Sequence, residues 1–99
     1  MKTASSKQSS TSLWYLYIIE TAKGRLYTGI TTNVQRRFME HSKGKGAKYF
    51  RLDSPKQVIY QCEFPDRSSA TKEEIRIKSL SRGQKLLLVK NSDVNISNR

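Results

Sequence analysis

Five side chains in this sequence could together hydrolyse a phosphodiester bond: Tyr17, Tyr27, Arg37, His41 and Glu74. At neutral pH this reaction needs a group that deprotonates water, positive charge around the transition state, and help for the departing 3′ oxygen. Tyrosine or histidine can move the proton, arginine can bind the phosphate, and a carboxylate can hold a metal ion. The surrounding elements must therefore bring all five to one place.

The segments around the two tyrosines predict a β-hairpin. Residues 13–19 are rich in aromatic and β-branched side chains, and residues 25–30 resume an extended pattern after the turn residues 20–24. Both alternating faces of the first strand carry apolar side chains, so we expect both to be at least partly covered. Such a hairpin can place Tyr17 close to Tyr27.

Arg37 and His41 lie on a predicted helix that follows the polar residues 31–33, any of which could cap it. At 3.6 residues per turn, both flank the apolar stripe that contains Phe38, whereas Arg36 points away from it. This position favours a functional role. The alternative is a solvated pair four residues apart on the helix surface.

The later segments complete the order ββαβαα. A third strand is predicted over residues 56–64, a helix over 70–80, and a short last helix after the capping-box pattern at 81–84. We expect an α+β fold in which a small three-stranded antiparallel sheet is flanked by about three helices. The folded domain is predicted to span residues 13–90, with a disordered leader at 1–12 and a disordered tail at 91–99.

Glu74 is predicted to point inward, on the same side of its helix as Ala70 and Ile77. A carboxylate in that position needs a cation, a hydrogen-bond donor or a metal, because burying it unpaired is costly. Lys78, four residues on, is the simplest partner. A pair with Lys78 and a metal site are both open readings of this residue.

The charge balance favours an anionic partner. The chain has 99 residues, with 19 Lys and Arg against 8 Asp and Glu, and a formal net charge of +11. This charge repels itself unless a polyanion is near, and nucleic acid is the most direct candidate. No apolar run is long enough to span a membrane, and no wide apolar face suits a membrane surface. The single cysteine, Cys62, allows no disulfide framework, which favours the cytoplasm.

A basic loop follows the first predicted helix. Residues 43–51 combine basic side chains with two glycines, and such a segment can lay cations and backbone N–H groups against phosphates. Surface lysines that only aid solubility are the alternative. The candidate nucleic-acid contacts are Arg36, Lys43, Lys45, Lys48 and Arg51.

The joint spacing of these motifs resembles the GIY-YIG nuclease superfamily, and in particular its small stand-alone bacterial members. The matching residues are YLY at 15–17, YTG at 27–29, the pair Arg37 and His41, and Glu74, and the resemblance covers residues 13–90. It implies a three-stranded antiparallel sheet with helices and a DNA nuclease that holds one divalent cation, Mg²⁺ or Mn²⁺, through Glu74. Tyr15 and Thr28 depart from the glycine and isoleucine of the motif.

From this resemblance we expect a metal-dependent DNA endonuclease or nickase that is directed by branched or damaged structure rather than by sequence. Tyr17 would be the general base, with its pKa lowered by Arg37 and the metal, and Tyr27 would orient the base or the water. Arg37 would grip a phosphate oxygen, and His41 would hydrogen-bond phosphate or relay a proton.

The alternative function is a non-catalytic binding module for DNA or RNA that retains the nuclease fold. A protein partner could direct either function to its target.

Overall fold

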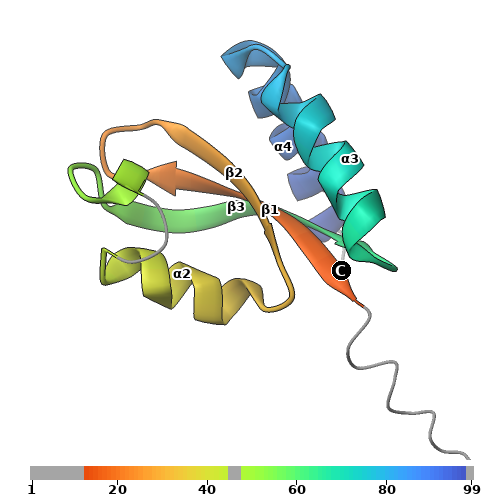
Figure 1. Ribbon diagram of the computed structural model, residues 1–99. Coiled ribbons are helices and arrows are strands. Elements are labelled where there is room, and N and C mark those ends of the chain that lie inside the picture. Colours follow the sequence, from red (N-terminus) through yellow and green to blue (C-terminus); the bar gives the residue numbers. More distant parts are fainter. Residues whose placement is uncertain (1–12, 45–47, 98–99) are drawn as a thin grey trace, which may run out of the picture.

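The computed structural model describes residues 13–44 and 48–97, so the predicted leader and Lys45 lie outside it. The elements confirm the predicted order ββαβαα, with one added turn of 3-10 helix (Figure 1). They are β1 (Trp14–Thr21), β2 (Leu26–Thr31), α2 (Val34–Ser42), η1 (Lys48–Phe50), β3 (Pro55–Phe64), α3 (Arg67–Lys78) and α4 (Arg82–Ser97).

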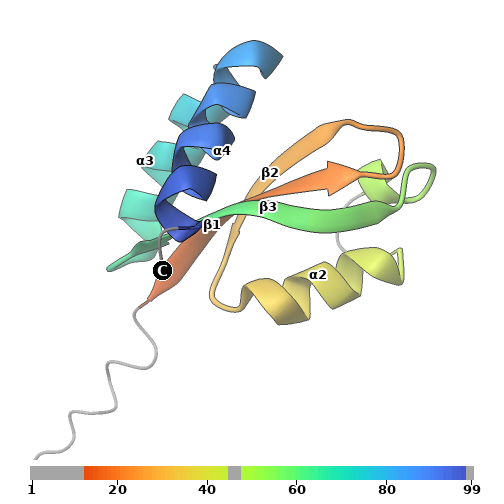
Figure 2. The same cartoon turned by 180° about the vertical axis from the view of Figure 1, so that it is seen from behind.

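The three strands form one antiparallel sheet with β1 in the middle, in the order β2-β1-β3. Figures 1 and 2 show α2 on one side of this sheet and the pair α3 and α4 on the other. The central strand is therefore covered on both faces. Leu16, Tyr17, Ile18 and Ile19 are each no more than 2% exposed, which confirms that both faces of the first strand are covered.

The β1–β2 hairpin closes through a short turn. Gly24 adopts a positive φ of 83°, a conformation that costs glycine little, and its N–H donates to the carbonyl of Thr21. The register pairs Tyr17 with Gly29 and Ile19 with Tyr27, so the two tyrosines lie on the same face.

Each of the three α-helices among the described residues begins next to a polar side chain. This side chain accepts a hydrogen bond from a backbone N–H that would otherwise be unpaired in the first turn. Asn33 caps α2 by accepting from Arg36 N at 2.9 Å, and Asp66 caps α3 by accepting from Ser69 N at 2.8 Å. Before α4, Ser81 and Gln84 exchange hydrogen bonds between side chain and backbone, as the predicted capping box requires.

The last helix extends past residue 90, where the sequence predicts the end of the domain. It continues to Ser97 and so includes most of the segment predicted as a tail. Residues 91–97 contain neither proline nor glycine, and continuing an existing helix is far easier than starting one. Within the described ranges, no helix combines the length and apolar character needed to cross a membrane.

Candidate active site

The glycine of the YTG motif makes room for a tyrosine ring. Tyr17 extends across Gly29 on the neighbouring strand, and a Cβ atom at Gly29 would lie 2.5 Å from Tyr17 Oη and 2.7 Å from Cζ. These separations are far below van der Waals contact. Glycine is therefore required here by the close approach of a side chain, not by a turn.

The Tyr17 hydroxyl meets His41 in the interior. Tyr17 Oη lies 3.0 Å from His41 Nε2, and the two residues are 2% and 0% exposed. Because His41 is fully buried, the alternative of a solvated surface pair with Arg37 is wrong. Burial of two polar groups is tolerable when they hydrogen-bond each other.

Two further rings, those of Tyr27 and Phe50, pack around this hydrogen bond. The imidazole of His41 lies 4.3 Å from the ring of Phe50 and 5.4 Å from that of Tyr27, in the second case edge to face. The Tyr17 and Tyr27 rings are 6.3 Å apart. The hairpin, α2 and η1 thus contribute to one aromatic cluster, formed by Tyr17, Tyr27, His41 and Phe50.

The pKa of Tyr17 bears on the expectation that this residue is the general base. Burial, and then the neighbouring Tyr27, raise the pKa of Tyr17 to about 12, although interaction with Arg37 lowers it. At neutral pH this phenol therefore stays protonated. Since Arg37 can only donate, the Tyr17 oxygen is the acceptor in their interaction.

Arg37 stands between this buried pair and solvent. Its side chain is 32% exposed, and Nη1 donates to Glu40 Oε1 at 2.8 Å. The Glu40 hydrogen bond, followed by a smaller contribution from Tyr17, raises the pKa of Arg37, so the guanidinium is permanently charged. A partly exposed pair within one helical turn is readily exchanged for a phosphate.

Tyr27 is the tyrosine of the pair that solvent can reach. It is half-buried, whereas Tyr17 is 2% exposed, and its ring packs edge to face on Phe50 at 4.7 Å. A molecule bound at the surface could therefore contact Tyr27 and Arg37, but not Tyr17 or His41.

Glu74 approaches from the other side of the sheet. It lies on α3, its side chain is 19% exposed, and Oε2 lies 3.0 Å from Lys78 Nζ. The simple pair predicted with Lys78 is therefore present. The negative charge of Glu74 contributes to raising the pKa of Tyr17 in the aromatic cluster.

The donor set around Glu74 suits a weakly held divalent cation. Mg²⁺ keeps several waters and needs only one or two protein carboxylates when a phosphate supplies further oxygen ligands. Within the described part of the chain, no group of three or more His, Cys, Asp or Glu side chains could hold a metal by itself. A partly exposed carboxylate whose partner is a flexible surface lysine fits this requirement.

The predicted basic contacts are spread over the surface. Lys43, Lys48 and Arg51 are exposed, and Arg36 is also exposed and lies 3.8 Å from Glu40. Lys45 lies outside the described residues. These positions follow α2 and η1, the two elements that contribute His41 and Phe50 to the aromatic cluster.

Asp53 was not singled out from the sequence, although it supports the site. It is 2% exposed and accepts hydrogen bonds from Thr21 Oγ1 at 2.6 Å, Lys23 N at 2.9 Å and Arg25 Nε at 3.0 Å. Burial by itself raises the pKa of Asp53, but these donors outweigh it and hold the pKa below its usual range. Asp53 thereby ties the segment after Phe50 to the hairpin that carries Tyr27.

No local signal in the sequence marks this role of Asp53. Its partners lie about thirty residues earlier in the chain, and an aspartate before Ser54 and Pro55 is also an ordinary turn residue.

Comparison with known proteins identifies the fold. The family described as the GIY-YIG catalytic domain matches residues 13–86. A UPF0213 protein of Yersinia pestis (strain Pestoides F) is 52% identical over 80 residues, which cover 81% of this chain and 84% of that protein. A UPF0213 protein of Yersinia pseudotuberculosis (strain IP 31758) matches with the same identity and coverage.

Two solved structures agree. The solution structure of a UPF0213 protein from Bacillus halodurans has a TM-score of 0.52 and 42% sequence identity, covering 79% of this chain and 83% of that one. The solution structure of a protein from E. faecalis has a TM-score of 0.59 and 37% identity, covering 85% and 90%. The chain therefore belongs to the GIY-YIG family of nuclease-type catalytic domains, and the UPF0213 proteins are its relatives.

Proposed function

We propose that this protein is a DNA endonuclease or nickase that hydrolyses phosphodiester bonds with the help of one divalent cation. The observation that carries the proposal is the arrangement of Arg37. Its charged group is partly open to solvent and interacts with Tyr17, the buried hydrogen-bond partner of His41. Positive charge held firmly beside a proton acceptor is what an attack on phosphate requires.

Tyr27 is the general base in this proposal. It is half-buried and packs against His41, so a water beside a bound phosphate can reach its hydroxyl. Tyr17 acts instead as a neutral positioning residue, because it is buried and its pKa is raised to about 12. It hydrogen-bonds His41 and interacts with Arg37, and so fixes the direction of the guanidinium.

Arg37 binds a non-bridging phosphate oxygen and stabilises the charge that develops there. Its planar fork can hold two oxygens at once, which a lysine cannot do. Glu40 holds the guanidinium when no phosphate is present. Phosphate binding therefore replaces one anionic partner of Arg37 by another.

Glu74 is the residue that would hold Mg²⁺ or Mn²⁺, and the ion when bound supplies positive charge at the leaving oxygen. Lys78 must then release the carboxylate that it now contacts at 3.0 Å. A flexible surface lysine can do so at little cost.

A cleavage panel tests the proposal. Purified protein is incubated with supercoiled plasmid and with branched oligonucleotides in Mg²⁺ or Mn²⁺, and Glu74→Gln is compared with Glu73→Gln. Glu73 is the neighbouring carboxylate, but it pairs with Arg76 at 2.6 Å instead of with Lys78. We expect Glu74→Gln to lower the rate by about 100-fold or more, a loss typical of removing a key charged group, and Glu73→Gln to leave it nearly unchanged. Equal rates for wild type and Glu74→Gln would contradict the proposal.

The second candidate function is a nucleic-acid-binding module without turnover. It is favoured by the internal pairing of both charged site residues, Arg37 with Glu40 and Glu74 with Lys78. This function predicts salt-sensitive binding to DNA or RNA, no cleavage in either metal, and unchanged affinity in Glu74→Gln.

The finer features of the function are part of the same proposal. We take the substrate to be DNA of branched or damaged structure, as in DNA repair, because the chain offers a net charge of +11 without a separate recognition domain among the described residues. A cytoplasmic location fits the single cysteine in the sequence.

A further inference from the structure

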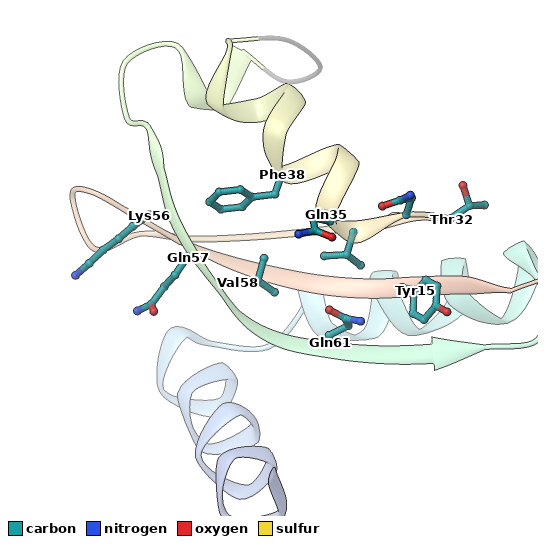
Figure 3. Close-up of a pocket in the computed structure, with 10 residues that line it drawn as sticks. Tyr15, Thr32, Gln35, Phe38, Lys56, Gln57, Val58 and Gln61 are labelled. Carbon is teal, nitrogen blue, oxygen red and sulfur yellow. The ribbon is translucent and has the colours of Figure 1, made fainter. Parts of the chain in front are cut away.

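A groove of about 720 Å³ lies between α2 and strand β3, apart from the aromatic cluster (Figure 3). In Figure 3, Lys56 and Gln57 lie at one end of it and Tyr15 and Thr32 at the other, with Gln35 and Phe38 reaching from the helix. None of the residues assigned to the proposed reaction lines this groove.

The groove is lined by apolar side chains and by side-chain amides that form no hydrogen bond within the described residues. Val34, Phe38 and Val58 form the apolar part and also pack against the core that contains Tyr17. The side-chain amides of Gln35 and Gln61 are exposed and form no hydrogen bond with the rest of the described chain. Each amide offers a donor and an acceptor side by side, which is the pattern of a nucleobase edge.

The two ends of the groove suit the remaining parts of a nucleotide. The half-buried ring of Tyr15 offers a face on which a base can stack, while Lys56, which forms no ion pair within the described residues, offers a positive charge for phosphate. The residues that line the groove include no carboxylate, although Glu20 accepts from Gln57 Nε2 at 2.8 Å and Glu63 pairs with Tyr15 across the strands.

We propose that this groove binds an unpaired nucleotide of a single-stranded segment. A base can stack on an aromatic ring and hydrogen-bond with side-chain amides only when it is unpaired. In a duplex, its faces are stacked on neighbouring bases and its Watson–Crick edge is bonded to the partner strand. A peptide would also find apolar and amide contacts here, but the net charge of +11 and the ammonium group of Lys56 at the end of the groove favour a polyanion.

The position of the groove gives this binding a role, and here the inference rests on the proposed function. Arg37 and His41 lie on one flank of α2, whereas Gln35 and Phe38 lie on the other, as the helical period requires. Tyr15 is two residues from Tyr17 along β1, so the groove adjoins the candidate active site. A strand held in the groove would present the neighbouring phosphodiester bond of a branched substrate to Arg37.

Binding measured without cleavage tests the groove separately from the reaction. A fluorescein-labelled single-stranded oligonucleotide and a blunt duplex of equal length are titrated with protein in excess EDTA, and binding is followed by fluorescence anisotropy. We expect Tyr15→Leu, which removes a stacking ring, and Gln61→Glu, which replaces an amide donor by a negative charge, each to weaken single-strand binding by about tenfold. Duplex binding should change far less.

Gln84→Glu is the matched control for Gln61→Glu. It makes the same change of charge, but Gln84 lies at the start of α4, outside the groove, where glutamate serves the capping box equally well. An equal loss in Gln84→Glu, or unchanged single-strand binding in both groove variants, would overturn the proposal. Thermal unfolding of each variant shows that the protein remains folded.

Amide resonances identify the occupant. In a ¹⁵N–¹H correlation spectrum, titration with a short oligothymidylate should shift the side-chain amide signals of Gln35 and Gln61 and leave that of Gln84 in place. If the oligonucleotide shifted other signals but left the side-chain amide signals of Gln35 and Gln61 unchanged, the strand would bind elsewhere and the proposal would be overturned. Because EDTA prevents cleavage, these measurements test nucleotide binding in the groove independently of catalysis. They remain informative even if the Glu74→Gln panel shows no nuclease activity.

Discussion

The two faces of the sheet share one central strand but are built from different chemistry. On the side of α3 and α4, Leu16 and Ile18 pack with Ile77 and Val89 in an aliphatic core. On the side of α2, alternate residues of the same strand place Tyr17 and Ile19 among aromatic rings. We call the first the aliphatic face and the second the aromatic face.

The difference lies in how polar groups are buried. The aromatic face encloses His41 and the Tyr17 hydroxyl, which satisfy each other at 3.0 Å. A core built only for stability would gain more from aliphatic side chains, because a buried polar pair recovers little beyond the cost of its desolvation. The aromatic face therefore carries groups whose value lies in chemistry or in positioning, and the aliphatic face holds the domain together.

The largest expected effect separates the two tyrosines of the aromatic face. Under the proposed function, Tyr27→Phe removes the proton acceptor and should lower the cleavage rate by about 100-fold or more. Tyr17→Phe removes a hydroxyl that positions Arg37 and should lower the rate much less, but it leaves His41 without this buried partner and should cost about 1–3 kcal/mol of stability. Single-turnover nicking and urea unfolding measure the two effects.

The reverse ranking would change the assignment. If Tyr17→Phe abolished cleavage while its folding stability stayed at the wild-type value, the Tyr17 phenol would have to act on the substrate directly. That outcome would require the aromatic face to open, because Tyr17 is 2% exposed.

Local features of the fold could be predicted from the sequence. The hairpin follows from residue pattern and turn composition, and the start of α4 follows from the capping box of Ser81 and Gln84, which forms as expected. These features depend on residues near one another in the chain. The joint spacing of the motifs likewise predicted the family.

The electrostatics of the site could not be predicted, because they depend on distant contacts. Burial of the strand is the main cause that raises the pKa of Tyr17, whereas from the sequence we expect Arg37 and a bound metal to lower it. Asp53 gains its role only when the segment after η1 returns to the hairpin. The groove beside Tyr15 likewise exists only once α2 lies over β3.

The next expected effect tests the close packing of the aromatic face. Gly29→Ala places a Cβ 2.5 Å from Tyr17 Oη, so either the ring or the strand must move, at a cost of about 1–3 kcal/mol. Gly83→Ala is the control, since its Cβ would meet nothing closer than Ser81 Oγ at 4.0 Å, and it should be neutral or slightly stabilising. Urea unfolding of both variants measures the difference.

A second substitution checks the cause of that loss. Tyr17→Ala clears the space above Gly29, so adding Gly29→Ala to it should cost much less than in the wild type. Equal costs in the two backgrounds would show that the strand requires glycine for another reason.

The smallest expected effect concerns a buried hydroxyl on the aliphatic face. Thr28 pairs with Ile18 across the strands, is 4% exposed, and its Oγ1 is the only buried side-chain oxygen or nitrogen without a hydrogen-bond partner within the described residues. Thr28→Val keeps the shape and removes the unpaired hydroxyl, so it should raise stability by about 1 kcal/mol, as judged by thermal or urea unfolding.

Thr31→Val is the matched control on the same strand, with the opposite expected sign. Thr31 is 5% exposed, but its Oγ1 accepts from Asn33 N at 3.2 Å and so supports the residue that caps α2. Loss of this contact should destabilise the protein by about 1 kcal/mol. If Thr28→Val were as destabilising as Thr31→Val, the Thr28 hydroxyl would have to bind an internal water, and the aliphatic face would then be less dry than its side chains indicate.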